Sequence, residues 1–256
     1  MLGSAVVYLG LTIAFAGLMG VVKPIRWLLI PTRPYALALA AAGVAVAATG
    51  FALPAPKSRS KRVETRLDTF APAWQFSERH TINIAASPAR VFEAIKRVRA
   101  DEIFLFRTLV WIRTGGRRPP ESIFAAAQRD ESIIDVATHT TFVSLADDAP
   151  RELVVGTAVR WPPGTRRPIQ SSQLFQQALP PGFTLATMNF VVMPDGENRS
   201  VVSTETRVFA NSPAARRRFA VYWRVIYPGS AIIRRMWLKA IRSRCTVRRP
   251  PQSRRR

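Results

Sequence analysis

Two long stretches without a charged side chain lie at the N-terminus of this chain, at residues 1–22 and 35–53. Their mostly apolar parts, 4–22 and 35–53, would each be about 28 Å long as an α-helix, close to the hydrocarbon thickness of a bilayer. The segment between them carries Pro24, Pro31 and Pro34, so the two helices should form a hairpin with both ends on one side. The sequence therefore predicts a transmembrane hairpin over residues 1–53.

Buried core helices and a cleaved signal peptide are the alternatives for these apolar stretches. A core helix of a small domain rarely excludes charge from its whole circumference. A signal peptide needs a basic segment before its apolar part, and no basic residue precedes Val22. Small residues at helical spacing would also let two helix backbones approach closely. They are Ala16 and Gly20 in the first span and Ala36, Ala40, Gly43 and Ala47 in the second.

The distribution of basic residues around the spans predicts the orientation of the hairpin. The connecting segment has Lys23, Arg26 and Arg33, whereas five basic residues follow the second span, against Glu64 alone. Because segments rich in Lys and Arg stay inside, everything after the hairpin should face the cytoplasm, at a bacterial inner membrane. The single cysteine, Cys245, excludes an intrachain disulfide and is compatible with that compartment. The five basic residues are Lys57, Arg59, Lys61, Arg62 and Arg66.

The chain is strongly basic, with a formal net charge of +22 and a pI near 11.7, so we ask which partner these basic residues contact. A basic surface is typical of nucleic-acid binding, and solubilising charge is a further alternative. Here the charge gathers just after the second span and at the C-terminus, where anionic headgroups are the nearest partner. We expect contact with the membrane surface rather than with nucleic acid. The predicted contact residues are Lys57, Arg59, Lys61, Arg62, Arg254, Arg255 and Arg256.

After the hairpin the chain divides into three predicted parts. Residues 54–75 form a basic, proline-containing linker, residues 76–247 a single domain of ordinary size, and residues 248–256 a disordered basic tail. In the domain, a strand at 79–85 leads through Ser87 and Pro88 into a helix. Further helices are predicted at 103–112 and 120–128, and strands at 140–146, 152–161, 182–193 and 199–209, with the last two as a hairpin.

A long amphipathic helix is predicted from Pro213 onward, because large apolar residues recur along one face. Pro228 and Gly229 interrupt this stripe, so the helix should kink or split near Tyr227, with Ser230 able to cap the second half. A loop between two separate helices is the alternative. The stripe consists of Phe219, Trp223, Ile226, Ile233, Trp237 and Ile241.

The segment FSERHTINIAASPARVFEAI, residues 76–95, resembles the opening of the START-like SRPBCC superfamily, which includes polyketide cyclases and birch-pollen-allergen-type proteins. The segments LADDAPRELVVGTAVR (145–160) and NFVVMPDGENRSVVSTETRVF to IRSR (189–244) are similar to a bacterial subgroup of that superfamily. The resemblance implies an α+β helix-grip fold, with a curved antiparallel sheet around a long C-terminal helix. It also implies an apolar cavity used for lipids or other hydrophobic molecules. The hairpin and the tail lie outside the resemblance.

Residues typical of catalysis are sparse. The chain has only two histidines, His80 and His139, and one cysteine, so no Cys/His zinc site can form. The adjacent carboxylates Asp147 and Asp148 lie in a predicted turn, where their side chains diverge. No phosphate-binding glycine motif occurs. The sequence therefore indicates no catalytic residue, no metal and no cofactor.

A ligand site is predicted on the strand at 199–209 and its neighbour. Alternation places Thr204 and Thr206 on one face, and we expect Asn189 on the preceding strand to point the same way. Trp223 and Trp237 on the helix stripe would complete the site. The alternatives are threonines that reflect strand propensity and tryptophans that only fill the core. We expect a membrane-anchored domain that binds a hydrophobic or lipid-like molecule. A cyclase- or hydratase-type enzyme, or a non-catalytic interaction module, are alternatives, and the oligomeric state is not indicated.

Overall fold

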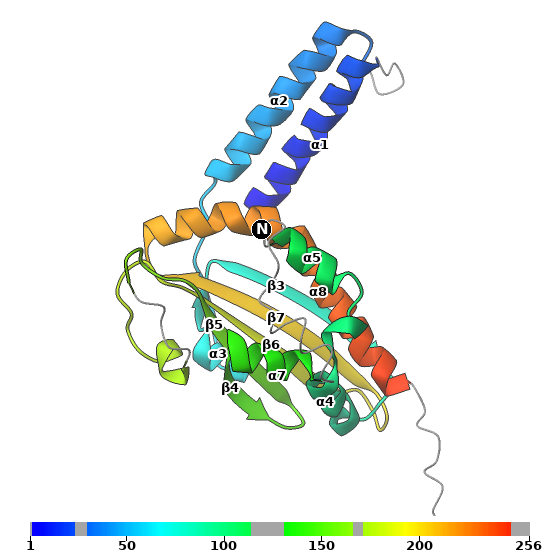
Figure 1. Ribbon diagram of the computed structural model, residues 1–256, viewed down its shortest axis with the longest axis vertical. Coiled ribbons are helices and arrows are strands. Elements are labelled where there is room, and N and C mark those ends of the chain that lie inside the picture. Colours follow the sequence, from blue (N-terminus) through cyan, green and yellow to red (C-terminus); the bar gives the residue numbers. More distant parts are fainter. Residues whose placement is uncertain (1, 24–29, 114–130, 166–170, 247–256) are drawn as a thin grey trace, which may run out of the picture. The chain divides into compact units, whose positions relative to one another are not determined.

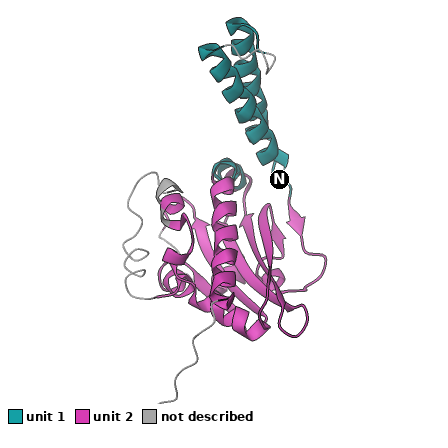
Figure 2. Cartoon of the chain, turned by 90° about the vertical axis from the view of Figure 1, so that its right-hand side faces the viewer, with its two compact units in different colours: residues 1–56, 216–225 teal, residues 57–215, 226–256 magenta. Residues whose placement is uncertain are grey.

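The computed structural model describes residues 2–23, 30–113, 131–165 and 171–246 and shows an α+β protein (Figure 1). It has a five-stranded antiparallel sheet, a long C-terminal helix and two apolar N-terminal helices. The chain forms two compact units (Figure 2). Unit 1 comprises residues 1–56 and 216–225, and unit 2 comprises residues 57–215 and 226–256.

In unit 1, helices α1 (Leu2–Val22) and α2 (Arg33–Ala52) pack along a seam of small residues. A Cβ atom added at Gly10 or Gly17 would lie 2.3–2.4 Å from a backbone nitrogen of α2, so only glycine permits this approach. The sequence predicted this seam correctly in α2. In α1 the seam contains Gly17 instead of the predicted Ala16, and Ala16 is only half-buried. The buried seam residues are Ser4, Val7, Gly10, Ala14, Gly17 and Gly20 in α1 and Ala36, Ala40, Gly43, Ala47 and Gly50 in α2.

The outer surface of the helix pair carries large apolar side chains. Phe15 is 65% exposed, and Leu9 and Leu18 are each 58% exposed. Both helices are long and apolar enough to span a membrane. A water-soluble helix pair buries its large apolar side chains between the helices. Here the small residues are buried and the large apolar ones are exposed, which is typical of helices that associate within lipid.

The end of α2 is capped by a side chain from another part of unit 1. The guanidinium group of Arg224 donates hydrogen bonds to the carbonyl oxygens of Phe51 (3.0 Å) and Leu53 (2.6 Å). The last carbonyls of a helix have no partner within the helix, so a cation there both pairs them and matches the helix dipole. Burial lowers the pKa of Arg224 from its ordinary value.

In unit 2, the five strands pair in the order β3–β7–β6–β5–β4, with every neighbouring pair antiparallel. The strand β3 leads into α4 as predicted, and β6 and β7 form the predicted hairpin. The strands are β3 (Phe76–Ile84), β4 (Val143–Asp148), β5 (Glu152–Arg160), β6 (Thr184–Pro194) and β7 (Ser200–Ala210).

One face of the sheet, here called the α8 face, packs against helices. Met188, Phe190 and Val202 of the sheet join one apolar cluster with Trp237 and Ile241 of α8. Helices α4 and α7 contribute to the same cluster, and α7 was not predicted. The longer helices with residues in this unit are α4 (Pro88–Arg97), α5 (Phe106–Arg113), α7 (Ile133–Thr140) and α8 (Pro213–Thr246), of which residues 216–225 belong to unit 1. The helix predicted at 120–128 lies outside the described residues.

The opposite face, here called the α3 face, is covered by the segment that was predicted to be a linker. This segment contains β1 (Ser58–Arg59) paired with β2 (Ala73–Trp74), and the short helix α3 (Arg66–Phe70). Leu67 of α3 is fully buried and contacts Val154 of β5. The structure thus differs from the prediction from residue 57 onward, because the polar side chains of this segment find buried partners on the sheet.

Helix α8 is a single helix with Pro228 inside it, so of the predicted kink or split near Tyr227 the split into two helices does not occur, nor does the alternative of a connecting loop. The hydroxyl of Ser230 does not cap a second helix. It donates instead to a carboxyl oxygen of Glu78 on β3, at 2.7 Å. Proline removes one backbone donor, but the turns on either side retain theirs, and the packing of the apolar stripe offsets that loss.

Candidate functional site

The register of β6 and β7 assigns each side chain to one face of the sheet. Phe190 pairs with Thr204 and Met188 with Thr206, so both threonines lie on the α8 face. Asn189 pairs with Glu205 and therefore lies on the α3 face. The expectation that Asn189 points the same way as the two threonines is wrong, since neighbouring positions on a strand alternate between faces.

A polar cluster occupies the α8 face where β3 meets α8. The carboxyl group of Glu78, which is 2% exposed, accepts a hydrogen bond from Ser230 and contacts Nε2 of His80 at 2.7 Å. Nε of Arg235 lies 3.4 Å from Nδ1 of His80 and can only donate to it. This favours the neutral tautomer in which Nε2–H of His80 donates to Glu78. The cluster therefore forms one connected chain from α8 through His80 to the buried carboxyl.

The hydroxyl of Tyr227 belongs to the same cluster. Burial raises its pKa, the charge of Glu78 raises it further, and Arg235 opposes both effects. Glu78, His80 and Tyr227 are thus three titratable side chains gathered on a face that is otherwise mostly apolar. Such convergence is typical of binding and catalytic sites, although structural networks show it as well.

Several buried polar atoms on the α8 face lack a hydrogen-bond partner among the described residues. Oγ1 of Thr206 is one of them, and Thr206 pairs directly with Glu78 on β3. Nε1 of Trp237 is another, and the Trp237 ring packs edge-on to Phe190 with the ring centroids 5.0 Å apart. Oγ1 of Thr184 is a third. By contrast, the hydroxyl of Thr204 donates to the backbone oxygen of Asn189 at 2.8 Å.

The five residues that the sequence predicted as ligand contacts therefore do not lie together. Thr204, Thr206 and Trp237 share the α8 face in unit 2, whereas Asn189 lies on the α3 face and Trp223 belongs to unit 1. The residues that sequence reasoning missed are Glu78, Ser230 and Tyr227. The alternation of β3 could have placed Glu78 beside His80 on this face, but nothing in the sequence marks Glu78 as buried.

The α3 face holds a second polar network, which is fully paired. The guanidinium group of Arg207 bonds to Asp68 (2.7 Å), Glu205 (2.6 Å) and the carbonyl oxygen of Ala71 (3.1 Å). Cζ of Arg207 lies 3.9 Å from the ring centroid of Trp74. This arrangement joins α3, β2 and β7 through one buried cation.

The Asp68 carboxyl has several donors around it. Burial alone would raise its pKa, but hydrogen bonds from Ser60, Arg207 and the backbone N–H groups of Thr65 and Glu64 outweigh burial. Together they hold the pKa of Asp68 well below its usual range. The carboxyl therefore stays ionised at neutral pH and pairs with Arg207.

Asn189 takes part in the anchoring of α3. Its amide nitrogen donates to Glu152 at 2.7 Å, and Glu152 accepts the backbone N–H groups of Arg66 (2.7 Å) and Leu67 (3.1 Å). Its amide oxygen accepts the backbone N–H of Glu205. Asn189 thus orients the carboxyl group that binds the first turn of α3, a structural role.

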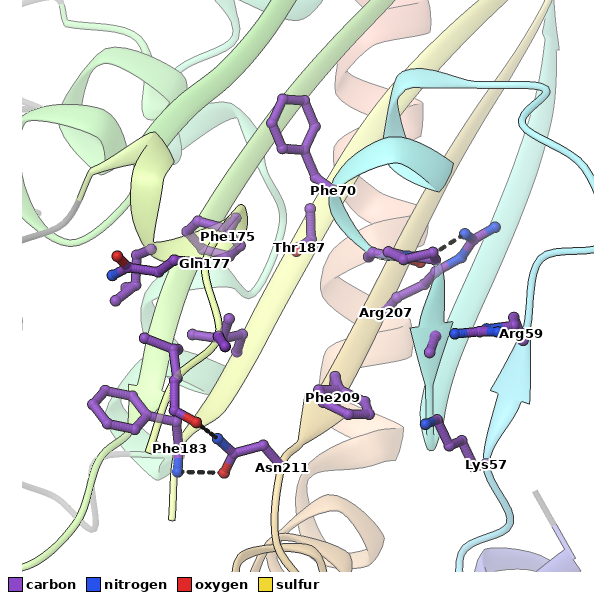
Figure 3. A pocket seen from close by; sticks show the side chains of 17 residues that line it. Lys57, Arg59, Phe70, Phe175, Gln177, Phe183, Thr187, Arg207, Phe209 and Asn211 are labelled. Carbon is purple, nitrogen blue, oxygen red and sulfur yellow. Dashed lines mark hydrogen bonds between the residues drawn. The ribbon is translucent and has the colours of Figure 1, made fainter. Parts of the chain in front are cut away.

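A pocket of about 360 Å³ opens on the α3 face, here called the α3-side pocket (Figure 3). Phe175 and Phe183 lie on one side of it, Lys57 and Arg59 lie on the other, and Phe209 lies on the sheet between them. Its other described lining residues are Phe70, Ala71, Pro72, Ala73, Leu174, Gln177, Ala178, Leu179, Leu185, Thr187, Arg207 and Asn211.

Two residues fix the wall that carries Phe175 and Phe183. The amide oxygen of Asn211 accepts the backbone N–H groups of Gly182 (2.8 Å) and Phe183 (2.9 Å), and its nitrogen donates to two carbonyls of the same loop. Gly156 of β5 lies under the Phe175 ring, where an added Cβ would come within 2.5 Å of a ring carbon. Both contacts hold the aromatic wall at a set distance from the sheet.

The predicted membrane-surface residues have several environments. Lys57 and Arg59 line the α3-side pocket, and Lys61 and Arg62 are exposed. Arg254, Arg255 and Arg256 lie outside the described residues. Among the residues that the structure describes, no group of three or more His, Cys, Asp or Glu side chains could hold a metal ion.

No family model matches the chain, and no curated protein matches it. Among solved structures, the chain is similar to the di-domain ARO/CYC BexL from the BE-7585A biosynthetic pathway, with 13% sequence identity and a TM-score of 0.25. The match covers 88% of this chain and 62% of that chain, so this chain spans less than two thirds of the length of BexL. A likeness of this degree carries no information on function.

Proposed function

We propose that unit 2 forms a helix-grip domain that binds a hydrophobic or lipid-like small molecule between its sheet and residues 226–246 of α8. The observation that carries this proposal is the buried hydroxyl of Thr206, which lacks a partner among the described residues beside the Glu78 cluster. Leaving a buried polar group unpaired costs about 1–3 kcal/mol, so such a group is retained more readily where a ligand can pair with it. Apolar surroundings with a few polar groups suit an amphipathic ligand.

The proposal includes a membrane anchor made of α1 and α2. Support comes from their length, their apolar composition and the exposure of large residues such as Phe15 on their outer surface. An exposed apolar surface of this kind is unfavourable in water and favourable in lipid. The excess of basic residues after α2 supports a cytoplasmic domain at a bacterial inner membrane, with Lys61 and Arg62 near anionic headgroups.

The binding proposal is tested on the full-length protein purified in mild detergent. Native mass spectrometry should show a stoichiometric small molecule on the wild type. Thr206→Val should lower its occupancy about tenfold, because the ligand's polar group loses a buried partner.

Thr204→Val is the matched control for this test. Its hydroxyl already donates to Asn189, so occupancy should stay at the wild-type level. A wild type that carries no molecule, or a Thr206→Val protein with full occupancy, would contradict binding on the α8 face.

A cyclase- or hydratase-type enzyme acting on the same molecule is the second candidate. The observation in its favour is the convergence of Glu78, His80 and Tyr227, which could move protons to and from a bound molecule. The test compares the molecules extracted from the wild type and from His80→Gln. An enzyme should accumulate its unconverted substrate in the variant, with a different mass. A binding protein should yield the same molecule from both.

A further inference from the structure

The α3-side pocket is separate from the site proposed above, because it lies on the opposite face of the sheet. Its volume of about 360 Å³ is at the lower end of the range for small-molecule sites. It is large enough for one narrow molecule and too small for a lipid with two acyl chains. Phe70, Phe175, Phe183 and Phe209 supply apolar walls on several sides.

The polar groups of this pocket differ in availability. Arg207 is already bound to Asp68, Glu205 and a carbonyl oxygen, and Asn211 is fully occupied by the backbone of the neighbouring loop. Lys57 and Arg59 have no acidic partner among the described residues. Nζ of Lys57 lies 5.4 Å from the ring centroid of Phe209, at the edge of the apolar wall.

No acidic side chain occurs among the described residues that line the pocket. Its charge is therefore positive, and the two available cations lie on the opposite side from Phe175 and Phe183 (Figure 3). A purely apolar ligand would leave these cations unused, and a small inorganic anion would leave the aromatic wall uncovered. Only a molecule with both an apolar body and a negative head group matches both sides.

We propose that the α3-side pocket binds a single-chain amphiphile with an anionic head group, such as a fatty acid. The apolar chain lies against Phe175, Phe183 and Phe209, and the head group lies between Lys57 and Arg59. The network around Arg207 keeps the floor of the pocket rigid, so little order has to be gained on binding.

Photolabelling of the full-length protein in phosphatidylcholine nanodiscs tests this proposal. The probes are a fatty acid that carries a diazirine in its chain and the corresponding alcohol. Labelled peptides are quantified by mass spectrometry. The acid should label residues 172–183, and the alcohol should need about tenfold more probe for the same labelling because it lacks the charge. Equal labelling by both probes, or no acid label on this segment, would overturn the proposal.

Paired variants separate pocket charge from charge near the membrane. Replacing Lys57 and Arg59 together with alanine should raise the half-labelling concentration of the acid about tenfold or more. Replacing Lys61 and Arg62 with alanine removes the same charge from the same segment, outside the pocket lining, and should leave labelling unchanged. An equal loss in both double variants would show nonspecific attraction and overturn the proposal.

A third variant blocks the pocket without changing charge. Ala178 is exposed at the pocket wall, so Ala178→Trp should fill the space while the unfolding temperature stays that of the wild type. Loss of labelling at an unchanged unfolding temperature supports the proposal, and full labelling contradicts it.

The source of the acid is resolved by competition. Palmitate supplied within the disc represents a membrane source, and octanoate supplied in solution represents a water-soluble source. Displacement of the probe by palmitate alone assigns the ligand to the membrane, whereas displacement by octanoate assigns it to the aqueous phase. Either result supports binding of an anionic amphiphile, and failure of both contradicts it.

Discussion

The two faces of the sheet bury polar side chains in different ways. On the α3 face, Arg207 and Asp68 have several partners each, and no described side-chain atom there is buried without one. On the α8 face, the hydroxyl of Thr206 and the indole N–H of Trp237 lack partners among the described residues. Because unpaired buried groups are unfavourable, the comparison separates polar groups that stabilise the fold from groups that are available to a ligand.

The same difference affects the two proposed ligands. Among the described residues that line the α3-side pocket, Arg207 is paired inside the face, and Lys57 and Arg59 at the edge are the cations without an acidic partner. Incomplete pairing on the α8 face leaves neutral donors in the interior. The α3 face is therefore suited to a charged head group at the surface, and the α8 face is suited to a mostly apolar molecule with one or two hydrogen-bonding groups.

The largest expected effect comes from breaking the α3-face network. Arg207→Met should lower the free energy of unfolding by about 3–5 kcal/mol, because it leaves the buried Asp68 carboxyl without its cation. Urea unfolding of the detergent-solubilised protein, followed by tryptophan fluorescence, measures this. Arg199→Met removes an exposed pair with Asp195 and should change stability by less than about 1 kcal/mol. Similar losses in both variants would contradict the structural role of the network.

Acid should weaken the α3 face through Asp68. Its folded-state pKa lies below the unfolded value of about 3.9, so the unfolded chain takes up the proton first as the pH falls. The stability that Asp68 contributes is complete above about pH 5 and is lost as the pH falls toward the folded-state pKa. Asp68→Asn should be less stable than the wild type at pH 7, and this difference should shrink below pH 4. A constant difference from pH 7 to pH 3 would refute the assignment.

A smaller effect is expected from Asn189, which was predicted to touch a ligand. Asn189→Leu should lower the free energy of unfolding by about 1–3 kcal/mol, because Glu152 loses a buried donor and holds α3 less well. Protease cleavage within residues 57–75 should speed up as α3 loosens, and the occupancy of the α8-face molecule should not change. Lost occupancy with normal stability would instead restore Asn189 to the ligand site.

The sequence predicted most elements of the fold because their patterns are local. The two N-terminal helices follow from long apolar runs without charge, and the alternation in β7 placed Thr204 and Thr206 on one face correctly. Alternation within one strand does not show which face of the neighbouring strand lies on the same side of the sheet. A shift of one residue in register moves Asn189 to the opposite face, and only the observed pairing with Glu205 decides between them.

The segment at 57–75 shows a second limit. Its polar composition is typical of a linker, but Asp68 and Ser60 acquire buried partners from Arg207, more than a hundred positions later in the chain. A polar side chain is buried where another group pairs with it, and a local sequence pattern does not show a partner so far along the chain. For the same reason the α3-side pocket could not be predicted, since its walls come from three separate parts of the sequence.

The smallest effect gives the sharpest comparison within a single face. Thr204→Val removes a hydroxyl that donates to Asn189 and should cost about 1 kcal/mol, the net value of a typical hydrogen bond. Thr206→Val removes a buried hydroxyl with no described partner and should leave the free energy of unfolding unchanged or raise it, because no bond is lost and the unpaired group is no longer buried. Both values are measured on protein stripped of its bound molecule.

On loaded protein the order of these two variants should reverse. A bound ligand raises the unfolding temperature more when its affinity for the folded state is higher. Because Thr206→Val should bind the ligand more weakly, it should lose part of this rise. Thr204→Val should keep that rise. An equal response of the two variants in both states would show that the unpaired hydroxyl of Thr206 has no part in binding, and the α8 face would then differ from the α3 face in structure alone.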